Sequence, residues 1–307
     1  MCGIVGLHLR NPDLHPQLGQ LLTGMLCEMQ DRGADSAGVA VYGDPRWSPP
    51  GHACVSFVPV ASAVSLSSGV DVEAAARSLS SALGAAVSVV DAGPTLVAHT
   101  EGDAYDLLRS AVAQVFPSAL VTGFGQDVAV LKGVGHPKAL AQAYGLAQAQ
   151  GWQGVGHTRM ATESAVDAGG CHPYAVGPDQ CLVHNGSFSN HATIRRGLRA
   201  RGAVFDSEND TEVGARFVAD RLAAGYDVET ALKDLCTTFD GFYTLLVSDS
   251  RSFAVVRDAI ACKPAVIAET DDWVAMASEY RALVGLPGIA EAHLYEPEPE
   301  VIYAWTR

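Results

Sequence analysis

The chain has 307 residues, of which 48% are hydrophobic and 18% are charged, and no run approaches the roughly 18 to 20 apolar residues of a membrane-spanning helix. Twenty Lys and Arg residues stand against 34 Asp and Glu residues, and the resulting net charge of −14 argues against nucleic-acid binding. The seven cysteines include no CxxC pair, so they indicate neither a disulfide framework nor a cysteine-rich metal site.

The first forty residues predict a buried strand, a helix and a second strand. Residues 2–9 (CGIVGLHL) are small and β-branched, and residues 18–30 carry Leu and Met at helical spacing. A glycine-punctuated turn over 31–38 leads into a strand at 39–42. The N-terminus lacks the basic region of a signal peptide, so we expect a cytoplasmic protein with reduced thiols.

The region from residue 52 to 150 predicts an inserted α/β subdomain within the chain. We interpret it as a packing or subunit-docking module because it carries no recognisable site. The predicted strands lie at 55–64, 86–91, 95–99, 119–123 and 128–131, and the predicted helices at 72–83, 105–115 and 138–149.

The last half of the chain places a block of helices between sets of strands, which favours a layered α+β fold. Neither GxGxxG nor GxxxxGK[ST] is present, so a nucleotide-binding fold is not supported. The predicted strands are 153–158, 180–184, 242–248, 253–257, 264–268 and 273–277, and the predicted helices are 190–200, 209–224 and 228–236.

Cys2 is the first candidate for chemistry. Removal of Met1 would give this residue a thiol and a free α-amine, which titrates near pH 7.7 to 8.0 and is suited to take a thiol proton. One residue could then serve as nucleophile and base. The alternative is a small apolar residue at the start of a buried strand.

The second candidate is Arg159 in GHTRMAT, at the end of a predicted strand. A guanidinium group can bind a carboxylate with two parallel hydrogen bonds, although a surface ion pair is the commoner role of one arginine. His157 in the same segment is interpreted as a core residue rather than a metal ligand, and no metal site is predicted anywhere in the chain.

Two further segments carry polar groups. Asn185 and Gly186 follow an apolar run and could donate two N–H groups to one oxygen, although Asn-Gly taken alone favours a hairpin turn. Asp210 could hold an ammonium group, whereas Glu208 and Glu212 are typical of residues that stabilise a helix N-terminus.

Five segments in this order resemble the class II glutamine amidotransferases, whose domain is an N-terminal-nucleophile hydrolase. They are MCGIVG, DRGADSAGVAV, GHTRMAT, HNGSFSNH and ENDTE, and the similarity spans about residues 2–43 and 150–280. The resemblance implies one amidotransferase domain over residues 1–307, folded as a four-layer αββα sandwich into which the small α/β subdomain is inserted.

The resemblance also implies roles for individual residues. Cys2 would attack the glutamine side-chain amide and form a γ-glutamyl thioester, with its own α-amine as base. The other implied roles are the oxyanion hole for Asn185 and Gly186, glutamine binding for Arg159, Thr162, Asp210 and Gly186, and support of the nucleophile strand for Arg32 and Gly33.

The segments TRMATES and ENDTE and the late segment ACKP are similar to stand-alone subunits related to glutamate synthase and N-methylglutamate synthase. This likeness implies a hetero-oligomer in which ammonia passes to a partner synthase subunit. No cofactor is expected in this chain, and FMN and iron-sulfur clusters would belong to partner subunits. The alternatives are a free-standing γ-glutamyl amidohydrolase and a catalytically retired scaffold or regulatory subunit.

Overall fold

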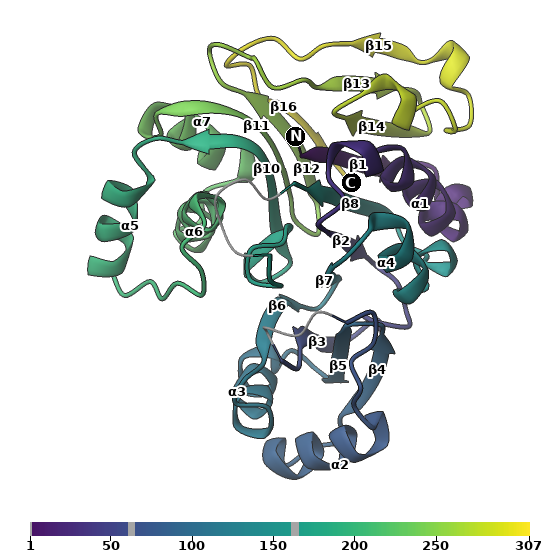
Figure 1. Ribbon diagram of the computed structural model, residues 1–307, viewed down its shortest axis with the longest axis vertical. Helices are drawn as coiled ribbons and strands as arrows, with labels where there is room; N and C mark the ends of the chain where they lie inside the picture. Colours follow the sequence, from purple (N-terminus) through teal and green to yellow (C-terminus); the bar gives the residue numbers. More distant parts are fainter. Residues whose placement is uncertain (1, 61–64, 161–165) are drawn as a thin grey trace.

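Two antiparallel sheets form the centre of the molecule in the computed structural model, which describes residues 2–60, 65–160 and 166–307 (Figure 1). The seven-stranded sheet has the order β15-β13-β14-β1-β8-β2-β7 and the five-stranded sheet the order β16-β12-β11-β10-β9. The first comprises β1 (Gly3–Leu9), β2 (Ser36–Tyr42), β7 (Val128–Val134), β8 (Gln153–Arg159), β13 (Val266–Glu269), β14 (Trp273–Ala277) and β15 (His293–Tyr295). The second comprises β9 (Tyr174–Gly177), β10 (Gln180–Phe188), β11 (Gly241–Ser248), β12 (Ser252–Arg257) and β16 (Tyr303–Thr306).

The central strands are apolar on both faces because both faces are covered. Successive side chains of a strand point to opposite faces. In β1, Ile4 therefore packs between the two sheets, while Val5 and Leu7 pack against the outer helices. In β10, Val183 likewise faces the other sheet and Leu182 the helices.

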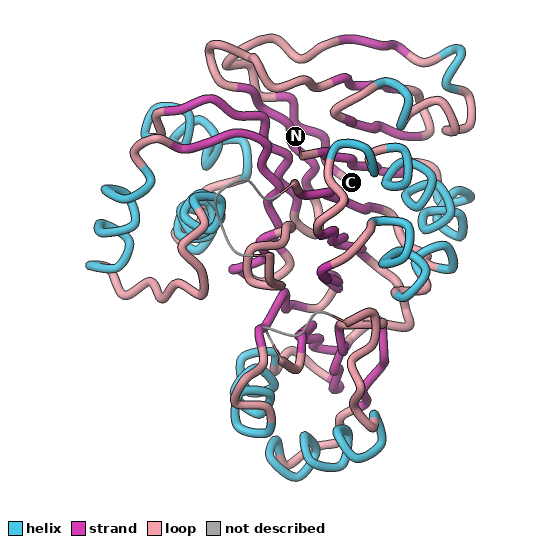
Figure 2. The backbone as a smooth tube through the Cα atoms, viewed as in Figure 1, coloured by secondary structure: helices cyan, strands magenta, loops and turns pink. Residues whose placement is uncertain are grey.

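Helices cover the outer face of each sheet, and this arrangement confirms the predicted αββα sandwich (Figures 1 and 2). Asn209 accepts a hydrogen bond from the backbone N–H of Thr211 and caps the helix that begins at Asp210. The seven-stranded sheet is covered by α1 (Leu18–Glu28) and α4 (Pro137–Ala143), and the five-stranded sheet by α5 (His191–Ala200), α6 (Asp210–Ala223) and α7 (Val228–Thr238). None of the described helices is long and apolar enough to cross a bilayer.

Residues 52–125 build a unit of their own with a four-stranded sheet in the order β4-β5-β3-β6. Its chain order is β-α-β-β-α-β, the split arrangement of ferredoxin-like units. Two helices pack on one face of this sheet, and its other face contacts β7. The elements are β3 (His52–Val58), α2 (Val72–Leu83), β4 (Ser88–Ala92), β5 (Thr95–Glu101), α3 (Tyr105–Val115) and β6 (Leu120–Gly125).

The sequence predicts the subdomain over residues 52–150, but the last part of this range lies in the sandwich. Strand β7 pairs with β2 over its whole length, from Val128 opposite Tyr42 to Val134 opposite Ser36. Helix α4 packs against α1 in the outer layer. A strand pattern in the sequence does not show which sheet the strand joins, so this boundary depends on contacts between distant segments.

Candidate active site

The nucleophile candidate and the arginine candidate lie at the same end of the seven-stranded sheet. Strands β1 and β8 are antiparallel, with Gly3 opposite Thr158, so the start of β1 lies beside the end of β8. Ile4 faces the space between the sheets, and the alternation of side chains directs Cys2 to that side as well. Val155 faces the same space, which places Arg159 on that face of β8.

Two side chains hold the backbone carbonyl of Cys2. Its oxygen accepts a hydrogen bond of 2.8 Å from Arg32 Nε and one of 3.1 Å from Asn185 Nδ2. The Cys2 Sγ lies 3.9 Å from the carbonyl oxygen of Met160, and the residue is half-buried. Three segments that are far apart in the sequence therefore meet at the first strand.

Arg32 and Gly33 form the turn that supports this end. Arg32 is buried and its Nη1 lies 2.7 Å from Glu279 Oε1. A Cβ atom at Gly33 would lie 2.5 Å from the carbonyl carbon of Arg159, so only glycine lets the turn approach β8 so closely. The turn thereby connects the position of Cys2 to that of Arg159.

Arg159 is 5% exposed at the end of β8. Its backbone oxygen accepts a hydrogen bond of 3.1 Å from the N–H of Asp35, and its guanidinium group lies against Gly170, where a Cβ would be 2.9 Å from Nη1. The hydrogen bond holds the backbone of Arg159, and a side chain at position 170 would collide with the guanidinium group. Thr162, the further substrate contact that the resemblance implies, lies outside the described residues.

Asn185 and Gly186 lie inside β10, where they pair with Thr244 and Tyr243 of β11. The alternative of a hairpin turn at Asn-Gly is therefore wrong. Gly186 has φ +149°, and a Cβ at this position would collide with the backbone of Phe242. A glycine is required here because of this positive φ and the close approach of the neighbouring strand.

Asp210 is the first residue of α6 and joins the site through β10. Its Oδ2 accepts a hydrogen bond of 2.8 Å from the N–H of Phe188, three residues beyond Asn185. Glu212 is fully buried and holds the preceding loop by accepting hydrogen bonds from the N–H groups of Asp206 and Ser207. Its role is therefore more specific than the expected stabilisation of a helix N-terminus.

The site also contains three buried histidines, His157, His172 and His184. The rings of His157 and His172 stack with centroids 4.0 Å apart, and the N–H of His184 donates to His172 Nδ1. Burial lowers the pKa of His157 to about 3 and that of His184 to about 4, and it also lowers the pKa of His172. The histidines are therefore neutral near pH 7 and add no positive charge beside Arg159.

Two residues of this site were not predicted from the sequence. Ser278 forms two hydrogen bonds of 2.9 Å with Ile4. Its Oγ accepts from the backbone N–H of Ile4, and its own backbone N–H donates to the Ile4 oxygen. Glu279 pairs with Arg32. They follow β14, which lies beside β1, and only that pairing distinguishes them from other polar residues after a strand.

No group of three or more His, Cys, Asp and Glu side chains within residues 2–60, 65–160 and 166–307 is arranged to hold a metal ion. The chemistry that the arrangement offers is that of a half-buried thiol, a bound carbonyl, an amide donor and a buried guanidinium group.

The chain is similar to known glutamine amidotransferases. A family model described as a glutamine amidotransferase domain matches residues 157–285. The glutamine amidotransferase-like protein GlxB of Rhizobium meliloti (strain 1021) is 45% identical over 305 residues, which cover 99% of this chain and 98% of that protein.

Two solved structures share the fold. The glutamine phosphoribosylpyrophosphate amidotransferase of B. subtilis aligns with 99% of this chain at a TM-score of 0.60 and 17% identity. A structure described as the allosteric regulatory enzyme of purine biosynthesis aligns with 99% at a TM-score of 0.63 and 18% identity. This chain spans 49% and 46% of those two chains. The end-to-end match to a relative 45% identical, together with the shared fold, shows that the chain belongs to the class II glutamine amidotransferases, enzymes that act on the side-chain amide of glutamine.

Proposed function

We propose that this enzyme hydrolyses L-glutamine to glutamate and ammonia through a γ-glutamyl thioester on Cys2. The observation that supports this most directly is the fixation of the Cys2 carbonyl by Arg32 and Asn185, which holds a half-buried thiol at the start of β1. A nucleophile held in one orientation loses little entropy on reaching the transition state.

In the proposed first step, the α-amine of Cys2 takes the thiol proton and the sulfur attacks the amide carbon of glutamine. The carbonyl oxygen becomes negatively charged, and the Asn185 amide and the Gly186 N–H donate hydrogen bonds to it. One N–H of the Asn185 amide binds Cys2, and the second remains for the substrate. The ammonium form of the amine then protonates the leaving nitrogen, the C–N bond breaks and ammonia departs.

In the second step, the free α-amine takes a proton from water as the water oxygen attacks the thioester carbon. The C–S bond breaks, the amine returns the proton to the sulfur, and glutamate is released. Arg159 would bind the α-carboxylate of glutamine and Asp210 its α-ammonium group, and Thr162 would add a further contact. Burial supports this role for Arg159, because a guanidinium group in a low-dielectric surrounding binds a carboxylate more strongly than one in water.

We further propose that the ammonia passes to a partner synthase subunit of glutamate-synthase or N-methylglutamate-synthase type. The support is the likeness of TRMATES, ENDTE and ACKP to the separately encoded subunits of that group. FMN and iron-sulfur clusters would then belong to the partner, and the partner would complete a hetero-oligomer.

Substitution of the nucleophile tests the first proposal. Cys2→Ala is expected to reduce glutamine hydrolysis by at least about four orders of magnitude, since it removes the sulfur on which the proposed thioester forms. The matched control is Cys262→Ala, which removes an exposed thiol and should leave the rate unchanged. Glutamate release by the Cys2→Ala protein at more than a hundredth of the wild-type rate would contradict the proposal.

The alternative of a free-standing γ-glutamyl amidohydrolase predicts full activity in the isolated chain. Purification from the source as a complex whose partner raises the rate of glutamine hydrolysis would exclude that alternative. A retired scaffold would show no Cys2-dependent hydrolysis in either form.

A further inference from the structure

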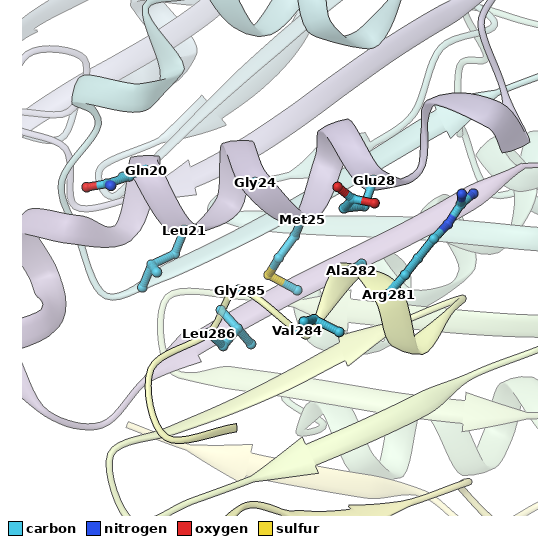
Figure 3. A pocket seen from close by; sticks show the side chains of 10 residues that line it. All are labelled: Gln20, Leu21, Gly24, Met25, Glu28, Arg281, Ala282, Val284, Gly285 and Leu286. Carbon is cyan, nitrogen blue, oxygen red and sulfur yellow. The ribbon is translucent and has the colours of Figure 1, made fainter. Parts of the chain in front are cut away.

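A groove runs along the exposed side of α1, between this helix and the segment that follows β14 (Figure 3). It has a volume of about 510 Å³. Its α1 wall consists of Gln20, Leu21, Gly24, Met25 and Glu28, and its second wall of Arg281, Ala282, Val284, Gly285 and Leu286. We refer to this feature as the α1 groove.

The middle of the α1 groove is open because a glycine lies in each wall. Apart from the adjoining residues and the backbone of α1 itself, no described heavy atom lies within 4 Å of the position that a Cβ would occupy at Gly24 or at Gly285. Glycine inside a helix costs about 1 kcal/mol relative to alanine. Gly24 is exposed, and no side chain among the described residues packs against it. A bare stretch of helix backbone lets another chain approach closely.

The charged residues of the α1 groove indicate what kind of segment would bind there. Glu28 is exposed and forms no ion pair with the residues that the structure describes. Arg281 is already paired, with Asp31 at 3.1 Å and with Glu279 at 2.9 Å. An aliphatic surface with one unpaired carboxylate is complementary to an apolar segment that carries a lysine or arginine.

The dimensions also suit a protein segment. Gln20 and Glu28 mark the two ends of the α1 wall, and eight residues of helix span about 12 Å. This length accommodates about two turns of an amphipathic helix, which is a common mode of recognition. A second copy of this chain is a poorer occupant because each copy carries a net charge of −14.

Both walls of the α1 groove continue into residues that hold the nucleophile. Beyond α1, Arg32 donates to the Cys2 carbonyl. On the second wall, Ser278 and Glu279 precede Arg281, and they bind Ile4 and Arg32. A segment that bridges the two walls would therefore stabilise the contacts that fix Cys2.

We propose that the α1 groove binds an apolar, lysine- or arginine-bearing segment of the subunit that receives the ammonia. This inference rests on the proposed function, since it assumes that such a subunit exists.

The test uses the full chain expressed in its source organism, with a photo-crosslinking residue at Gln20 in the α1 groove or at the exposed Ala192 on α5 as a control. We expect a crosslink from position 20, but not from position 192, to a second polypeptide. Mass spectrometry should place the attachment within an apolar segment that carries a lysine or arginine. A crosslink only to another copy of this chain, or no crosslink from position 20, would overturn the proposal.

Two matched substitutions complete the test. Gly24→Arg fills the α1 groove and should reduce recovery of the crosslinked subunit at least tenfold, whereas Gly197→Arg, in the exposed middle of α5, should not. Equal recovery with Gly24→Arg would also overturn the proposal. Glutamine hydrolysis by the isolated wild-type chain is measured separately, so that failure of the proposed function and failure of the docking proposal can be distinguished.

Discussion

The unit over residues 52–125 and the Cys2 end of the sandwich are stabilised in contrasting ways. The first has a core of fully buried apolar side chains from neighbouring elements, among them Phe57, Leu79 and Leu108. At the Cys2 end, buried polar groups such as Arg32, Asn185 and Ser278 come from segments as much as 274 residues apart. The comparison indicates that loss of a side chain should affect stability in the first region and the reaction in the second.

The largest of these effects is expected for Asn185→Ala. Removal of one oxyanion donor lowers kcat by about 10²- to 10³-fold in enzymes of this kind of chemistry. The rate of glutamate release at saturating glutamine measures it. The control is Asn190→Ala, which removes an amide that binds the oxygen of Thr238. A decrease of less than threefold for Asn185→Ala would contradict the proposed oxyanion hole.

Leu108→Ala tests the opposite side of the comparison. Leu108 is fully buried on α3, and deletion of its side chain should lower the free energy of unfolding by about 2 to 5 kcal/mol. Leu107→Ala, at the adjacent residue that is 64% exposed, should change it by less than about 0.5 kcal/mol. Urea denaturation measures both. A decrease of more than twofold in the kcat of folded Leu108→Ala would contradict the claim that the first region affects stability and not the reaction.

Acid should weaken the Cys2 end through its buried histidines. The pKa values of His157 and His184 in the folded protein, about 3 and about 4, lie below the usual 6.5, so the unfolded chain binds protons first as the pH falls. The free energy of unfolding should therefore have its full value above pH 6.5. Below that pH it should decrease by about 1.4 kcal/mol per pH unit for each histidine.

Urea denaturation at pH 7, 6 and 5 measures this slope. His157→Gln should reduce the slope by the contribution of one histidine, whatever its effect on stability at pH 7. An unchanged slope would show that His157 is not responsible for the loss of stability in acid.

The smallest effect is expected for Glu279→Gln, which removes the charge opposite Arg32 but keeps an acceptor oxygen. Because Arg32 holds the Cys2 carbonyl, we expect kcat to fall about tenfold, which corresponds to about 1.4 kcal/mol, with little change in KM. The control is Glu229→Gln, which removes a surface pair with Lys233 and should leave both constants unchanged. An unaltered kcat for Glu279→Gln would exclude a positioning role.

The sequence predicted well the elements that have a local apolar pattern. It predicted poorly the features that depend on contacts between distant segments. Helices 72–83 and 105–115 have the predicted bounds, since their apolar spacing is local. Strands β9, β15 and β16 were missed because they have only three or four residues each, too few for an alternating pattern to be distinct.

The candidate site shows the same division. The five segments led to Cys2, Arg159 and Asn185, which the structure places at one end of the sandwich. The turn preference of Asn-Gly gave the wrong local structure for Gly186, because pairing with β11 outweighs this local tendency. Glu279 has no signal in the sequence, since its role depends on the pairing of β14 with β1.

The most direct test of the account is the chemical state of the first residue during turnover. Active protein is mixed with glutamine, quenched in acid and digested. The mass of the N-terminal peptide is then measured by mass spectrometry. The account predicts a peptide that begins at Cys2 with a free amine and carries a glutamyl group on sulfur. An active protein that retains Met1, or a glutamyl group on any other cysteine, would contradict it.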